Sequence, residues 1–181
     1  MIKKALAVTA IVAIAVVGNL NAGETYYESS KQVVDKNPPP PPPAEPCFAA
    51  GEAQLDLFAA YVDPKEGKSS AGGGLNLNYF VTEMLGIGVG ALWYNPGTVV
   101  HNVYGNLILR YPFQDTCIAP YLYGGGGGHW DSNTMWTAHV GAGIEYRVTP
   151  NVGVFADGRY TWADEDEGQF WMIGGGIRLA F

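Results

Sequence analysis

All four arginines of the chain lie in stretches where polar and apolar residues alternate. Four carboxylates occupy the same polar face of such stretches. A planar guanidinium group binds a carboxylate at two points and keeps its charge, so this combination favours ion pairing over acid–base catalysis. In a narrow interior, such groups must neutralise one another. We therefore predict an interior ion-pair network formed by Glu52, Asp56, Arg110, Glu145, Arg147, Asp157, Arg159 and Arg178.

Other residues that could do chemistry form weaker patterns. The glycines at residues 124–128 lack the spacing of a phosphate-binding loop, and the four acids at residues 164–167 are typical of a solvated loop. His129 and Ser132 share one predicted outer loop, where an enzyme that modifies outer-leaflet lipids could use them. No motif supports that activity, so it is kept only as an alternative. We predict that the protein is not an enzyme, with no catalytic, cofactor-binding or metal-binding residue.

Eight segments with strand-like alternation follow one another from residue 51 onward, each bounded by turn residues. Most approach the roughly 9 to 11 residues that a tilted strand needs to cross a bilayer. Short connections alternate with longer polar ones, as they do between the periplasmic and outer ends of membrane barrels. The predicted strands are residues 51–62, 72–81, 85–94, 100–111, 118–126, 134–148, 151–162 and 169–181.

This pattern predicts an all-β fold, an eight-stranded antiparallel up-and-down transmembrane β-barrel at residues 51–181. Eight strands about 4.8 Å apart and tilted by about 40° enclose a diameter of roughly 16 Å, which side chains fill. The apolar face of each strand points to lipid, because a one-residue slip would expose an arginine there at a cost of about 2 to 4 kcal/mol. Residues 118–123 give no clean alternation, so the phase of that strand stays open.

Ten aromatic residues provide an independent check on this assignment of faces. They have the lipid-facing parity and fall at strand ends, where membrane proteins carry aromatic belts. We expect an outer belt and an inner belt, formed respectively by Tyr61, Trp93, Trp136, Tyr160, Trp162 and Trp171 and by Tyr79, Tyr111, Tyr146 and Phe181.

The segment before the strands has a different composition. Lys3 and Lys4 precede a short apolar run, which predicts a signal peptide at residues 1–22. Residues 23–50 include six consecutive prolines and predict a stiff periplasmic linker, with a ligand for cell-wall or partner domains as the alternative. Loss of Lys3 and Lys4 with the leader changes the formal net charge from −7 to −9. Nucleic acid is a poor partner for such a chain.

Cys47 and Cys117 are the only cysteines, and both are expected at the periplasmic end of the barrel. Exported cysteine pairs can be oxidised. A disulfide between these two would draw the leader across the inner mouth of the barrel as a strap. Closing a loop of about 70 residues contributes roughly 4 kcal/mol in the chain-entropy model. Two free thiols are the alternative.

Four stretches carry a likeness to a known family: residues 78–90 (NYFVTEMLGIGVG), 118–126 (IAPYLYGGG), 140–162 (VGAGIEYRVTPNVGVFADGRYTW) and 174–181 (GGGIRLAF). They resemble the small eight-stranded outer-membrane β-barrels of the OmpA-like and opacity-protein type. The resemblance implies a monomer in the outer membrane of a Gram-negative bacterium, surrounded by outer-membrane lipid and with a plugged lumen. It also implies that Phe181, at the end of the last strand, is the signal read by the barrel-assembly machinery.

These observations together predict a non-enzymatic structural or surface protein that serves adhesion or envelope integrity. A narrow solute or ion channel is a second alternative, and a soluble lipocalin-like carrier is a third. The carrier is disfavoured by the inward charges, because its lumen would be apolar. The sequence identifies no ligand or host target.

Overall fold

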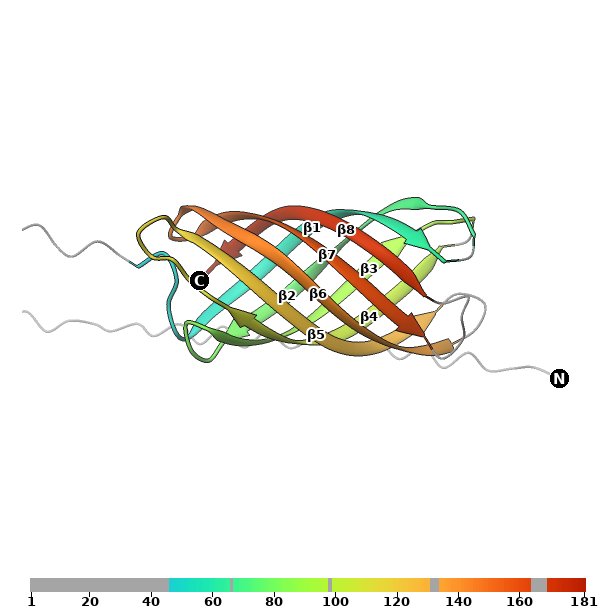
Figure 1. Cartoon of the computed structure of the whole chain (residues 1–181), viewed down its shortest axis with the longest axis horizontal. Coiled ribbons are helices and arrows are strands. Elements are labelled where there is room, and N and C mark those ends of the chain that lie inside the picture. The colour runs from blue at the N-terminus through green and yellow to red at the C-terminus, as the bar shows by residue number, and fades with distance from the viewer. Residues whose placement is uncertain (1–45, 66, 98, 131–133, 164–168) are drawn as a thin grey trace, which may run out of the picture. The chain divides into compact units, whose positions relative to one another are not determined.

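The computed structural model describes residues 46–65, 67–97, 99–130, 134–163 and 169–181. The predicted signal peptide and residues 23–45 of the predicted linker lie outside this part of the chain. The described residues form a closed barrel (Figure 1) of eight strands: β1 (Glu52–Pro64), β2 (Ser70–Phe80), β3 (Leu85–Tyr94), β4 (Val100–Arg110), β5 (Ile118–Trp130), β6 (Thr134–Thr149), β7 (Val152–Ala163) and β8 (Phe170–Ala180). The same residues include no helix that is long and apolar enough to cross a membrane.

Each strand pairs antiparallel with the next one along the chain, and β1 pairs with β8 to close the barrel. Figure 1 shows the strands inclined to the barrel axis. Such a tilt is what closure of a sheet into a barrel requires. The predicted eight-stranded antiparallel barrel is confirmed, and the predicted strand ends lie within two residues of the observed ones except at the end of β5.

β5 continues to Trp130 instead of ending at Gly126, because its glycine run keeps its pairing with both neighbouring strands. This pairing also determines which side chains of β5 face lipid, a point that the sequence left open. Tyr121 and Tyr123 are buried in the interior, whereas Leu122 between them is 58% exposed on the lipid face. The sequence had placed His129 in an outer loop, but the extension makes it part of β5.

Side chains along the strands alternate between the lipid face and the interior. On β1, for example, Asp56 is fully buried and the adjacent Leu57 is 53% exposed. The aromatic residues expected in the two belts are exposed, apart from the half-buried Tyr160. The ring centre of Tyr160 lies 4.9 Å from that of Trp162 and 4.8 Å from that of Trp171. A bilayer can therefore meet apolar side chains between two aromatic rims.

Inward-pointing glycines make room for tyrosine rings from neighbouring strands. A Cβ atom on Gly143 would lie 2.6 Å from the Cζ atom of Tyr121, and one on Gly90 would lie 2.5 Å from the ring of Tyr104. Both contacts are too short for real atoms, so any larger residue would displace a ring. Since both tyrosines are buried, these glycines allow large rings to fill the lumen.

Candidate functional site

Buried charged residues gather at the end of the barrel where β1 begins and β8 ends, which we call the inner mouth; the opposite end is the outer mouth. Strands β1, β4, β6 and β8 contribute these residues, and none is more than 7% exposed. Six of the eight residues of the predicted network meet there: Glu52, Asp56, Arg110, Glu145, Arg147 and Arg178.

Two glutamates each join more than one arginine. Glu52 Oε1 accepts hydrogen bonds from Arg110 Nη1 at 3.0 Å and from Arg147 Nη2 at 2.5 Å. Glu145 pairs with Arg147 through its Oε1 atom and with Arg178 Nη1 through Oε2, the latter at 2.5 Å. The glutamates thereby connect the arginines of three different strands into one cluster.

Asp56 completes this cluster at the seam between β1 and β8. Its two oxygens accept hydrogen bonds from Arg178 Nε at 2.6 Å and from Arg178 Nη2 at 2.8 Å, and Asn78 Nδ2 donates to it at 2.9 Å. Three carboxylates therefore balance three guanidinium groups. Removal of one partner from a buried ion pair leaves an uncompensated charge, at a cost of about 3 to 5 kcal/mol.

The other two residues of the predicted network, Asp157 and Arg159, form no ion pair within the described part of the chain. Asp157 instead accepts a hydrogen bond from the hydroxyl of Tyr121 at 3.0 Å. The guanidinium carbon of Arg159 lies 4.5 Å from the ring centre of Tyr104. Each of these two residues therefore has an aromatic partner. Tyr121, the partner of Asp157, belongs to β5, whose phase the sequence left open.

A cavity of about 30 Å³ lies beside these two residues. Its lining includes Asn76 and Asn106, whose side chains are held in place by hydrogen bonds. The Tyr104 hydroxyl donates to Asn76 Oδ1 at 2.9 Å, and His139 Nε2 lies 2.6 Å from Asn106 Oδ1. The volume suits about two water molecules.

Apolar side chains fill the lumen near the outer mouth. Val62 and Leu92 are 0% exposed and Phe170 is 1% exposed, and they pack together with Tyr94 and Met172 in one cluster. This apolar layer was not among the features predicted from the sequence. Its signal was present on β1 and β8, because Val62, Phe170 and Met172 share the parity of the inward charges on those strands.

His129, a candidate of the lipid-modifying alternative, is 4% exposed and faces the interior. Its ring centre lies 6.2 Å from that of Tyr94 and 6.4 Å from that of Phe170. The other candidate, Ser132, lies outside the described residues. Among the residues that the structure describes, no three His, Cys, Asp or Glu side chains are grouped so as to hold a metal ion.

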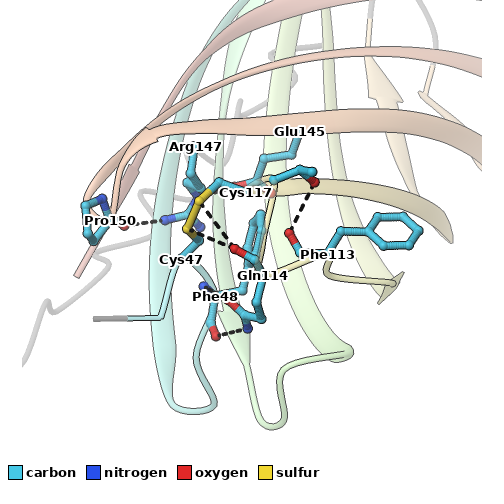
Figure 2. The surroundings of a disulfide bond; sticks show 9 residues. Cys47, Phe48, Phe113, Gln114, Cys117, Glu145, Arg147 and Pro150 are labelled. Atoms are coloured by element: carbon cyan, nitrogen blue, oxygen red, sulfur yellow. Dashed lines mark hydrogen bonds and ion pairs between the residues drawn. A yellow bond between two sulfur atoms is a disulfide. The ribbon is translucent and has the colours of Figure 1, made fainter. Parts of the chain in front are cut away.

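A disulfide joins Cys47 to Cys117, with the two Cα atoms 5.5 Å apart (Figure 2). Residues 46–51, which we call the strap, therefore run from the turn between β4 and β5 to the start of β1. Within the strap, Phe48 is 0% exposed, and its ring centre lies 4.7 Å from Cζ of Arg110 and 5.2 Å from Cζ of Arg147. This role of Phe48 was not predictable from the sequence, since a single aromatic residue after prolines has no periodicity.

Comparisons with known proteins agree with this architecture. The family model described as outer membrane protein beta-barrel domain matches residues 44–178. No curated protein matches significantly. Similar solved structures include the N-terminal β-barrel domain of Pseudomonas aeruginosa OprF, with 18% identity and a TM-score of 0.63 over 74% of this chain and 99% of that one.

Two further structures show the same fold. Neisserial surface protein A is 22% identical, with a TM-score of 0.60 over 74% of this chain and 99% of its own. OprG of Pseudomonas aeruginosa is 12% identical, with a TM-score of 0.54 over 74% of this chain and 97% of its own. The chain belongs to the outer membrane protein beta-barrel domain family and is an outer-membrane protein of a Gram-negative bacterium.

Proposed function

We propose that this protein is a non-enzymatic structural and surface component of the outer membrane, with its inner mouth in the periplasm and its longer loops outside. The observation that carries this proposal is the filling of the lumen. Phe48 and the ion-pair cluster occupy the inner mouth, and the layer around Leu92 occupies the outer mouth. Such a barrel suits a rigid support for surface loops in adhesion or envelope integrity.

The same features support the partners that we propose. A lipid-facing surface with two aromatic rims fits outer-membrane lipid. A monomer is supported by the pairing of β1 with β8, because a barrel that closes on itself leaves no strand edge for another chain to extend. For biogenesis we propose recognition by the barrel-assembly machinery, to which Phe181, 75% exposed, would be presented.

Planar-bilayer recording tests the sealed lumen against the channel alternative. The purified protein should insert without giving steady single-channel currents, because Phe48 and the ion-pair cluster fill the inner mouth and the layer of Val62, Leu92 and Phe170 fills the outer mouth. A steady conductance that changes when Arg147 or Asp157 is neutralised would replace the proposal with a narrow ion pathway. A pore-forming porin in the same bilayer serves as the positive control.

Incubation with outer-membrane lipids, followed by mass spectrometry, tests the absence of enzymatic activity. We expect the lipids to remain unmodified, since the buried side chain of His129 faces Tyr94 and Phe170 inside the barrel. A lipid product formed by the wild type and lost in both His129→Ala and Ser132→Ala would establish the lipid-modifying enzyme instead.

A further inference from the structure

The strap is held to the turn between β4 and β5 by one covalent bond and by one side chain. The amide of Gln114 donates from Nε2 to the carbonyl oxygen of Phe48 at 2.8 Å, and Gln114 Oε1 accepts from the Phe48 N–H at 3.3 Å. The disulfide of Cys47 lies beside these bonds, as Figure 2 shows. Cutting the disulfide would leave Gln114 as the polar anchor of Phe48 at this turn.

The other end of the strap is tied to β2 by a backbone hydrogen bond from the Gly51 N–H to the Phe80 carbonyl oxygen at 2.8 Å, which sets the point about which the strap turns. Gly51, directly before β1, has a φ of +79°, and no heavy atom lies within 4 Å of the place where its Cβ would be. Glycine adopts this left-handed conformation without steric cost and retains wide backbone freedom. The strap therefore resembles a short arm with a hinge at Gly51 and a fastening at Cys47.

Under the strap, Phe48 covers the guanidinium group of Arg110, one nitrogen of which lacks a hydrogen bond. The guanidinium of Arg110 lies between two rings, 4.7 Å from the centre of Phe48 and 3.8 Å from the centre of Phe80. Its buried Nη2 atom has no hydrogen-bond acceptor among the described residues. Because a guanidinium N–H is a strong donor, water that reached Arg110 after removal of Phe48 would gain a hydrogen bond and offset part of the lost packing.

We propose that the Cys47–Cys117 disulfide is a redox-operated latch that holds Phe48 as a lid over Arg110 and Arg147. A dithiol reduces the bond: the disulfide takes up two electrons and two protons to give two thiols, and the dithiol becomes a disulfide. The strap then swings about Gly51, and the inner ion pairs meet water. A disulfide oxidant reverses the exchange, taking up the two electrons and two protons of the thiols, and closes the lid again.

Opening of this lid leaves the barrel sealed. The apolar layer of Val62, Leu92 and Phe170 lies at the outer mouth. Its hydrophobic cluster includes no residue of the strap and neither cysteine of the disulfide. Reduction should therefore admit water to the inner mouth without creating a passage through the membrane. The proposed latch and the proposed sealed lumen can therefore be refuted separately, because the first is tested by solvent access at Phe48 and the second by ion conductance.

A single fluorine label tests the latch in the full-length protein, folded in phospholipid nanodiscs. A fluorinated phenylalanine replaces Phe48 alone, and the relaxation of its ¹⁹F signal is measured with a soluble gadolinium chelate before and after treatment with dithiothreitol. The same label at Phe113, which is 48% exposed in the turn that holds Cys117, is the matched control. Alkylation with mass spectrometry verifies that both thiols are free, and unheated gel mobility verifies that the barrel stays folded.

In the oxidised protein, the signal from position 48 should be protected and that from position 113 should relax strongly. Reduction should raise the relaxation at position 48 several-fold, towards the value at 113, and reoxidation should restore protection. Cys47→Ser should show the released signal with or without dithiothreitol; it leaves Cys117, with its φ of +54°, untouched. Persistent protection at position 48 with both thiols free would overturn the proposal. Unfolding of the barrel on reduction would also overturn it, because the disulfide would then serve stability alone.

Discussion

Arg178 and Asp56 lie directly opposite each other in the register that pairs β8 with β1, and the guanidinium binds both oxygens of the carboxylate. This two-point ion pair thus lies on the seam where β1 and β8 close the barrel. A shift of one residue in this register would separate the two groups and turn one towards lipid. Closure in the correct register and neutralisation of buried charge are therefore coupled.

Substitution of Arg178 tests this coupling. Arg178→Met should lower the free energy of unfolding by about 3 to 5 kcal/mol, because Asp56 and Glu145 lose a buried partner. Urea unfolding in lipid vesicles measures the change. Arg178→Lys keeps the charge without the two-point geometry and should fall between wild type and Arg178→Met. Equal stability of all three proteins would show that the seam does not depend on this pair.

Leu122 provides a test of the phase of β5. Because its side chain is 58% exposed on the lipid face, between the levels of Tyr146 and Trp136, Leu122→Arg should destabilise the barrel in lipid by about 2 kcal/mol or more. Leu122→Met is the control of similar size and polarity. Identical unfolding curves for the two variants would mean that position 122 does not meet the hydrocarbon.

The packing of Tyr121 against β6 predicts a penalty for a single added methyl group. Gly143→Ala should cost about 1 to 3 kcal/mol, because the new Cβ would lie 2.6 Å from Cζ of Tyr121 and 2.6 Å from Cβ of Asp157, of which Tyr121→Ala relieves the first. Gly105→Ala is the matched control, with its nearest neighbour 3.8 Å from the added atom. The double variant Gly143→Ala with Tyr121→Ala should lose less stability than the two single changes added together, and strict additivity would contradict the proposed clash.

Removal of the disulfide should also affect global stability. Closing a loop with a sequence separation of 70 residues contributes roughly 4 kcal/mol in the chain-entropy model. Urea unfolding of the wild type with and without dithiothreitol should therefore differ by up to about this amount. Cys47→Ser should unfold at one midpoint in both conditions, and a wild type that is indifferent to the reductant would exclude an entropic contribution.

The proposed role of Phe181 concerns biogenesis. Phe181→Ala should reduce the fraction of folded protein in cellular outer membranes, as read from heat-modifiable gel mobility, while refolding in detergent stays unchanged. Tyr111→Ala removes another exposed aromatic residue of the inner belt, 58% exposed in the structure, and should have the smaller effect in cells. Equal losses for both variants would point to the belt itself.

Alternation of side chains was sufficient to predict the strands and most of their faces. It works where the two faces differ, as between Asp56 and Leu57, because the cost of an inverted register is then large. It fails in β5, where Tyr121 and Leu122 are both compatible with lipid and the following glycines have no side chain at all. Only pairing with β4 and β6 settles that phase.

The candidate site was predictable as a set of charges and not as a set of contacts. Parity places Asp157 and Arg159 inside, but their actual neighbours depend on how the strands are staggered around the barrel, which no single segment encodes. Phe48 lies outside every repeating pattern, so its burial over Arg110 depends on tertiary structure alone. Long-range contacts of this kind are the part of a barrel that alternation cannot predict.

The sulfur bridge also determines how the molecule carries mechanical load. Crosslinked in this way, the chain is a lariat whose ring contains β1 to β4. Tension applied to the chain ahead of Cys47 is divided between the strap, which leads into β1, and the two sulfur atoms, which lead into the turn before β5. A pull on the leading segment is thereby spread over two strands that are far apart in the sequence.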